Sequence, residues 1–203
     1  MPKAVARKNH KMSLGGIIVM MLMALSGCVA GSGNENDVAD QGYVSGDGTL
    51  TTWSKSERGD VIALTGTDFA GENVDTSEFS GQILVINTWY AACPPCRAEA
   101  PVLAEVSKER AAAGVQFIGI NTVDEAGSAL AFEEKHQITY PSIADGKSQT
   151  ISKLQGIVPV RAVPTTLVLD KEHRVVARIL GQIDATTLNG LIDDVLAENT
   201  ETS

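Results

Sequence analysis

The chain has 203 residues, which is enough for one domain of ordinary size with tails at its ends. Hydrophobic residues make up 43% of it and charged residues 20%, a composition that argues against a disordered or fibrous protein. The net charge is −9, with 25 acidic against 16 basic residues, which argues against binding to nucleic acid or to an anionic surface.

The first 27 residues have the order of a secretory signal. Basic residues as far as Lys11 are followed by an apolar run from Met12 to Ser26, the pattern that directs export. The run ends in Leu25-Ser26-Gly27-Cys28, which resembles the bacterial lipobox, whose cysteine carries a diacylglyceryl group and becomes the mature N-terminus. This resemblance implies lipid attachment at Cys28, and the alternatives are an uncleaved signal anchor or plain secretion. All three place the protein outside the cytoplasm, and the first places it on the cell membrane.

Residues 28–57 are predicted to be a flexible tether. From Gly31 to about Ser56 the chain is rich in small and polar residues and has few large apolar ones. Such a segment cannot bury enough surface to offset its ordering entropy. The folded domain is therefore predicted to span residues 58–203.

The folded part alternates between strand and helix patterns. The predicted strands are short apolar runs bounded by turn residues, and they cover residues 61–64, 71–76, 83–86, 115–120, 165–169 and 175–180. The predicted helices cover residues 93–113, 124–135, 148–154 and a segment that follows Asp184. Asp124 and Asp184 are the predicted N-caps, and Gly114 is the predicted left-handed end of the first helix. This order predicts an α/β fold, with a central mixed β-sheet flanked by helices on both faces and an N-terminal β-hairpin extension.

The chemistry is predicted at Cys93-Pro94-Pro95-Cys96. Two cysteines separated by two residues, where a strand leads into a helix, are a redox dithiol signature. Cys93 would occupy the helix N-cap, where free N–H groups and the positive end of the dipole stabilise the attacking thiolate. Cys96 lies one turn further along, so Cys93 is predicted to be the nucleophile and Cys96 the resolving thiol. Pro94 and Pro95 fit the first turn, but each removes a donor to the thiolate, which predicts a more reducing couple.

The cysteine pair has two alternative interpretations, a metal site and a structural disulfide. A metal site would need further ligands, but the remaining cysteine is Cys28, and His136 and His173 lie on predicted polar faces. A permanently closed structural disulfide would bridge so small a loop that it would constrain little of the unfolded chain. We therefore predict no metal and no cofactor other than a redox-active Cys93–Cys96 disulfide.

Two motifs carry a family resemblance. The first runs from Trp89 to Pro101 around the cysteine pair, and the second is Val163-Pro164-Thr165-Thr166 followed by a strand. In this order they resemble the TlpA/ResA/DsbE family of membrane-tethered thiol-disulfide oxidoreductases, over roughly residues 61–197. The resemblance implies a thioredoxin fold and a cis peptide bond before Pro164. It also implies that the backbone of Val163 pairs with an extended substrate.

Further site roles follow from this resemblance. Glu99, three residues after the second cysteine, matches an acid that the family places near the dithiol, and the alternative is a solvated helix glutamate. Trp89 is assigned to substrate binding together with Val163. Ala92 stands where thioredoxins proper usually carry Trp, and Asn87 where they carry a buried acid. Docking preference and proton handling are therefore expected to differ from those of thioredoxins.

The predicted function is reduction of protein disulfides outside the cytoplasm, as family members do for apocytochrome c before haem attachment. The expected partners are protein disulfide substrates, apocytochrome c among them, and a membrane electron donor of the thiol-disulfide transfer type. The alternatives are a general oxidant or isomerase of secreted proteins, and a non-enzymatic lipoprotein that binds a metal or a partner. A thiol peroxidase is disfavoured, because Tyr90 stands where that class carries Thr.

Overall fold

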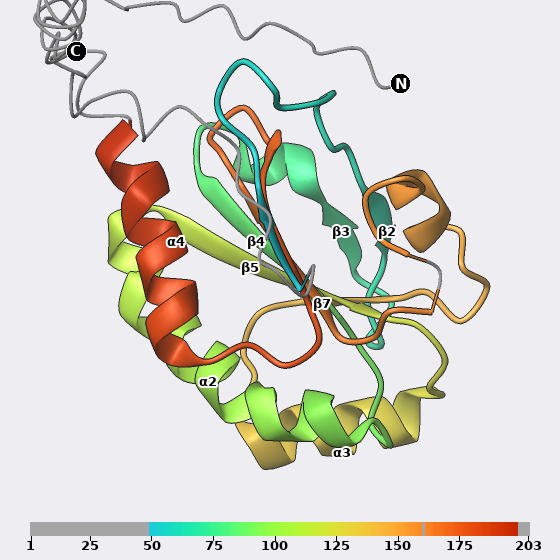
Figure 1. The fold of residues 1–203 in the computed structure, drawn as a ribbon. Coiled ribbons are helices and arrows are strands. Elements are labelled where there is room, and N and C mark those ends of the chain that lie inside the picture. Colours follow the sequence, from blue (N-terminus) through green and yellow to red (C-terminus); the bar gives the residue numbers. More distant parts are fainter. Residues whose placement is uncertain (1–48, 160, 199–203) are drawn as a thin grey trace, which may run out of the picture. The chain divides into compact units, whose positions relative to one another are not determined.

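A six-stranded mixed sheet with the strand order β1-β8-β7-β4-β5-β6 forms the centre of the fold (Figure 1). The structure is a computed structural model that describes residues 49–159 and 161–198. β4 pairs in parallel with β5, and β5 with β6, whereas the pairs on the other side of β4 are antiparallel. The strands of this sheet are β1 (Leu50–Thr52), β4 (Ile83–Trp89), β5 (Val115–Asn121), β6 (Ser142–Ala144), β7 (Thr165–Leu169) and β8 (Val175–Leu180).

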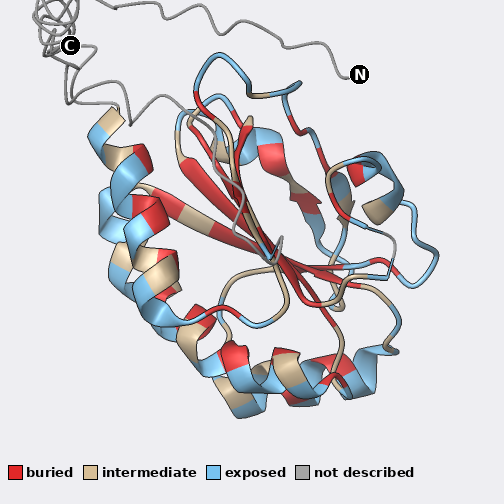
Figure 2. Cartoon of the chain, in the orientation of Figure 1, coloured by how far each residue is buried: buried red, intermediate tan, exposed pale blue. Residues whose placement is uncertain are grey.

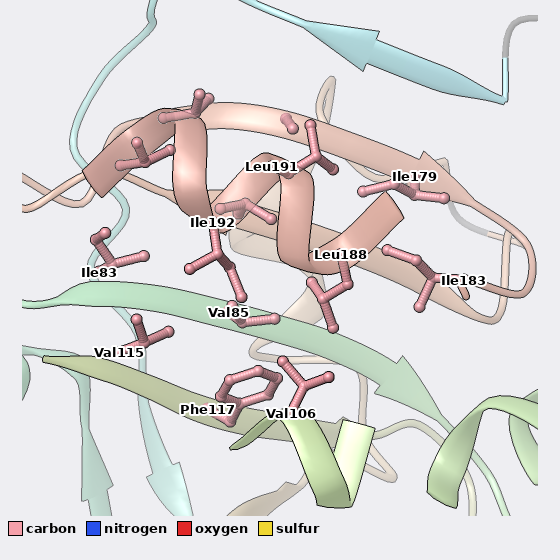
Figure 3. Close-up of a cluster of buried hydrophobic side chains, with 14 of the residues drawn as sticks. Ile83, Val85, Val106, Val115, Phe117, Ile179, Ile183, Leu188, Leu191 and Ile192 are labelled. Carbon is pink, nitrogen blue, oxygen red and sulfur yellow. The ribbon is translucent and has the colours of Figure 1, made fainter. Parts of the chain in front are cut away.

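Two long helices, α2 (Pro94–Arg110) and α4 (Ala185–Glu198), lie side by side on one face of the sheet (Figure 1). Alternate residues of the central strands point toward them because successive strand side chains face opposite ways. Figure 3 shows Val85 of the sheet beneath Leu188 of α4, and Phe117 beside Val106 of α2, all buried. Helix α3 (Ala126–His136) packs at the end of the sheet, where its Phe132 stacks on Trp89 with ring centroids 4.6 Å apart.

The opposite face is covered by a hairpin and two short 3-10 helices. The hairpin consists of β2 (Thr65–Thr67) and β3 (Asn73–Asp75), and the helices are η1 (Thr76–Phe79) and η3 (Ile151–Leu154). Their apolar side chains close a second core over the even-numbered residues of β4. The sheet is thus buried on both faces, and in Figure 2 its strands are mostly red while the outer sides of α2 and α4 are pale blue. The predicted α/β thioredoxin fold is confirmed, although long helices cover only one face.

The predicted C-terminal boundary of the tether, residue 57, is wrong. Leu50–Thr52 form β1, which pairs with β8 at one edge of the sheet, so the folded domain begins before residue 58. Arg58 then lies buried between the carboxylates of Asp170 and Glu198, at 3.1 and 2.7 Å. A three-residue edge strand carries too little pattern to be recognised in a polar segment. The predicted signal, Cys28 and the first part of the tether lie outside the described residues.

Other elements match the prediction with local shifts. A short 3-10 helix, η2 (Ala111–Ala113), continues α2 as far as Gly114, which has φ +77° as predicted. The hairpin falls a few residues later than predicted at its first strand, and β6 was not predicted. The predicted N-cap Asp124 is wrong, because α3 starts after Glu125 and the Asp124 carboxylate accepts a hydrogen bond from the Ala91 N–H instead. No helix among residues 49–159 and 161–198 is long and apolar enough to cross a membrane.

Candidate active site

The two cysteines form a disulfide at the start of α2, directly after the loop that follows β4. Their Cα atoms are 5.3 Å apart, and the residues before α2 place Cys93 at the N-cap with an extended backbone. The Cys96 N–H donates to the Cys93 sulfur at 3.2 Å, while Pro94 and Pro95 have no N–H to offer. The sequence prediction for this helix start is therefore confirmed. Both cysteines are only 1% exposed, so exposure does not distinguish the nucleophile from the resolving thiol.

The loop before β7 lies against the dithiol. The Val163–Pro164 peptide bond is cis, as the family resemblance implied. The Val163 carbonyl oxygen lies 3.9 Å from the Cys93 sulfur, and Val163 is half-buried against the cysteine cluster. Two residues 70 positions apart in the chain are thus brought together because β4 and β7 are neighbours in the sheet.

Glu99 is buried rather than solvated. The side chain of Glu99 is completely buried in α2, and its carboxylate accepts hydrogen bonds from the Asn87 side chain at 2.8 Å and the Ile183 N–H at 3.0 Å. Asn87 also donates to the Thr166 hydroxyl at 3.1 Å, two residues after Pro164. Burial raises the pKa of Glu99 to about 7, against the opposing effect of these two donors. A carboxyl group one helical turn from Cys96 can therefore hold or release a proton near neutral pH.

Trp89 packs beneath the two cysteines in the same buried cluster. It is 3% exposed and belongs to the buried cluster that contains both cysteines and Phe132. The ring packs on Phe132 and does not line the cavity beside Val163, so the structure gives Trp89 a packing role beneath the dithiol and does not support its predicted role in substrate binding. Trp89 is buried because it is the last residue of β4 and its side chain points toward α3.

Two residues that sequence reasoning missed shape the loop before Cys93. Asp124 accepts hydrogen bonds from the Ala91 N–H at 2.6 Å and from the Asn121 side chain at 2.8 Å, and it thereby fixes that loop to the end of β5. Tyr90 is half-buried, contacts the cysteine cluster and lines a cavity beside Val163. An Asn-x-x-Asp spacing after a predicted strand is the only sequence signal that points to Asp124.

Comparisons with known proteins agree with this geometry. Residues 47–194 match the family model described as Redoxin. The thiol-disulfide oxidoreductase ResA of Bacillus cereus is 26% identical over 165 residues, which cover 81% of this chain and 86% of that protein. A DsbF homologue from Corynebacterium diphtheriae has a TM-score of 0.68 and 35% identity, covering 74% of this chain and 96% of that one. A secreted thiol-disulfide isomerase from Corynebacterium glutamicum has a TM-score of 0.69 and 30% identity, covering 77% and 98%.

The paired cysteines supply the chemistry that these relatives share. Proteins of this fold and class use a redox-active disulfide and no external cofactor. In the present chain that disulfide joins Cys93 and Cys96. The arrangement can accept two electrons by opening the bond, or donate two by closing it.

Proposed function

We propose that this chain, which belongs to the Redoxin family and within it to the TlpA/ResA/DsbE-like thiol-disulfide oxidoreductases, reduces protein disulfides outside the cytoplasm. The observation that carries the proposal is the Cys93–Cys96 disulfide at the start of α2, facing the Val163 carbonyl. Apocytochrome c is the substrate that the family resemblance favours. A membrane donor of the thiol-disulfide transfer type would return the protein to its reduced form.

The reaction proceeds by two exchanges. The Cys93 thiolate attacks one sulfur of the substrate disulfide, forms a mixed disulfide and releases the other substrate sulfur as a thiolate. The Cys96 thiolate then attacks the Cys93 sulfur, which closes the Cys93–Cys96 bond and releases the second substrate thiolate. Two electrons pass from the protein to the substrate, and two protons follow to the released thiolates. Glu99, with its pKa near 7, is suited to take part in this proton transfer as an acid or base.

The direction of transfer rests on the donors around Cys93. The thiolate has the Cys96 N–H nearby, but both residues between the cysteines are prolines, which cannot donate. Each missing donor disfavours the thiolate, and therefore the reduced form, relative to a helix start rich in N–H groups. Since about 30 mV corresponds to about 1.4 kcal/mol for this couple, one missing hydrogen bond has a measurable effect.

The reduction potential of the Cys93–Cys96 couple tests this direction. We expect a value nearer that of thioredoxin, about −270 mV, than that of the oxidant DsbA, about −120 mV. Equilibration with a glutathione buffer, followed by intrinsic tryptophan fluorescence, would measure it. A value above about −180 mV, in the range of disulfide isomerases, would overturn the reductase proposal in favour of an oxidant or isomerase.

We further propose that the protein is held on the outer side of the cell membrane by a lipid on Cys28. The Leu25-Ser26-Gly27-Cys28 sequence after the apolar run supports this. Mass spectrometry of the membrane-extracted protein should find a diacylglyceryl-modified N-terminal cysteine, and Cys28→Ala should abolish it. A membrane-bound species that still begins with Met1 would instead indicate an uncleaved signal anchor.

A further inference from the structure

A groove near the dithiol is lined by five apolar or aromatic residues and by five polar or charged ones, and most of its exposed surface is apolar. It has a volume of about 420 Å³, and we call it the apolar groove; its lining includes Tyr90, Val123, Ile151, Val158 and Val163. These residues come from the loop after β4, the loop after β5, the η3 region and the cis-proline loop. The side chains of these five residues take no part in the proposed exchange at Cys93 and Cys96.

Two residues of the apolar groove, Val163 and Tyr90, also contact the cysteine cluster. Val163 lines the groove, and its carbonyl oxygen lies 3.9 Å from the Cys93 sulfur. Tyr90 lines it too and also contacts the cluster that holds both cysteines. An extended polypeptide advances about 3.3 Å per residue. A substrate whose cysteine reacts with Cys93 therefore presents the side chain next to that cysteine to the groove.

Val123 gives the groove an exposed apolar wall. Among the described residues, the large hydrophobic side chains that are exposed are Val61, Val123 and Leu130. Val123 is 64% exposed and is the one of these three that lines the groove. An apolar side chain of a bound substrate would cover it, and this burial favours binding.

A second cavity adjoins the apolar groove and is lined mainly by polar and acidic residues. It has a volume of about 700 Å³ and shares Val123 with the groove. Four acidic residues and one lysine line it: Asp68, Asp124, Glu125, Asp145 and Lys147. The one charged residue among the described residues that line the groove itself is Arg161. A basic substrate side chain is therefore favoured in the second cavity and disfavoured in the groove.

We propose that the apolar groove binds the apolar side chain next to the reacting cysteine of an extended protein substrate, while a basic side chain further along enters the acidic cavity. The inference rests on the proposed exchange at Cys93 and adds the chemistry of the substrate to it. The substrate class is a protein segment in which an apolar residue flanks the cysteine and a basic residue flanks the apolar one.

Short glutathione-linked peptides test this specificity. The first peptide has the order Lys-Leu-Cys-Leu-Lys, which is the same in both chain directions, the second replaces both Leu by Gly, and the third replaces both Lys by Glu. The full chain carrying Cys28→Ala is used, so that Cys93 and Cys96 are its only thiols. We expect kcat/KM to fall about tenfold with Gly and about fivefold with Glu, the second loss shrinking in high salt.

A matched pair of variants locates the effect. Val123→Ser should lower kcat/KM for the Leu peptide about threefold or more and leave the Gly peptide unchanged. Val61→Ser serves as the control, because Val61 is 59% exposed and lines neither cavity. Equal rates for the Leu and Gly peptides, or equal effects of the two substitutions, would overturn the inference.

Exchange is measured in both directions: from reduced protein with the glutathione-linked peptide, which releases free peptide and glutathione, and from oxidised protein with free peptide and glutathione, which forms the peptide–glutathione disulfide. If oxidation alone proceeds, the reductase proposal fails, but the groove still predicts the same order of peptides. If reduction proceeds without any preference, the groove inference fails and the reductase proposal stands.

Discussion

The buried carboxyl group of Glu99 makes the stability of the protein depend on pH in an unusual direction. Most native carboxylates are stabilised as anions, but burial raises the pKa of Glu99 from 4.5 to about 7. Between these two values the unfolded chain has already lost the proton that the folded chain keeps. The contribution of Glu99 to the free energy of unfolding is therefore fully present below pH 4.5 and falls as the pH rises to 7.

The size of this effect follows from the pKa difference. Each pKa unit corresponds to about 1.4 kcal/mol, so the contribution of Glu99 should fall by about 3 kcal/mol across this range. Glu99→Gln removes the titration. The substitution also costs about 1 kcal/mol at every pH. The single oxygen of Gln can accept from only one of the two donors, Asn87 or the Ile183 N–H, and its NH2 group then faces the other. The variant should be less stable than the wild type at pH 4 and more stable at pH 8.

Urea unfolding of the oxidised protein at several pH values between 4 and 8 measures this difference. Glu105→Gln is the matched control, since Glu105 is an exposed residue of the same helix and should show no such crossover. A stability difference between Glu99→Gln and wild type that is constant with pH would refute the reasoning. In the reduced protein, the same substitution should shift the pH profile of disulfide exchange, because the Glu99 anion raises the pKa of a nearby thiol.

Three further substitutions have expected outcomes. Pro94→Gly should make the couple more oxidising by about 30 mV in a glutathione equilibration, because it restores an N–H beside the Cys93 thiolate, and an unchanged or lower potential would contradict this. Gly119→Ala should lower the free energy of unfolding by about 1–3 kcal/mol, because a Cβ there would lie 2.7 Å from the indole nitrogen of Trp89. Arg58→Ala should cost about 3 kcal/mol in the same assay, because it leaves the buried Asp170 carboxylate without its closest cation.

Long elements with strong local signals could be predicted from the sequence. Thr165–Leu169 and Val175–Leu180 are strands with the predicted bounds, because each is an apolar run bounded by turn residues. The last helix was predicted from Asp184, whose carboxylate accepts from the Thr187 N–H at 2.9 Å, and from apolar residues at helical spacing. The helix start at Cys93 follows from the position of the cysteine pair between a strand and a helix pattern, and the two prolines are compatible with a first turn.

The features that were missed depend on contacts between distant residues. β1 and β6 have three residues each, and their pairing with β8 and β5 defines them as strands. Asp is a residue type that is common at helix N-caps, but the carboxylate of Asp124 accepts from the Ala91 N–H instead. The resemblance placed Glu99 near the dithiol, but its partner, the Ile183 N–H 84 positions away, has no local signal, and neither has the stacking of Trp89 on Phe132. A single sequence does not encode such pairings in any local pattern.

The burial of both sulfur atoms has a kinetic consequence for the oxidised protein. A thiol can open a disulfide only by an approach that brings it into contact with a sulfur atom. With the two cysteines only 1% exposed, small thiols that diffuse in the surroundings should meet this bond rarely. A protein that docks on the Val163 loop is instead held next to the Cys93 sulfur, which gives it a binding contribution that small thiols lack. Exchange of the Cys93–Cys96 disulfide with small thiols would then be slow, and its oxidation state would be set by exchange with the proteins that dock on it.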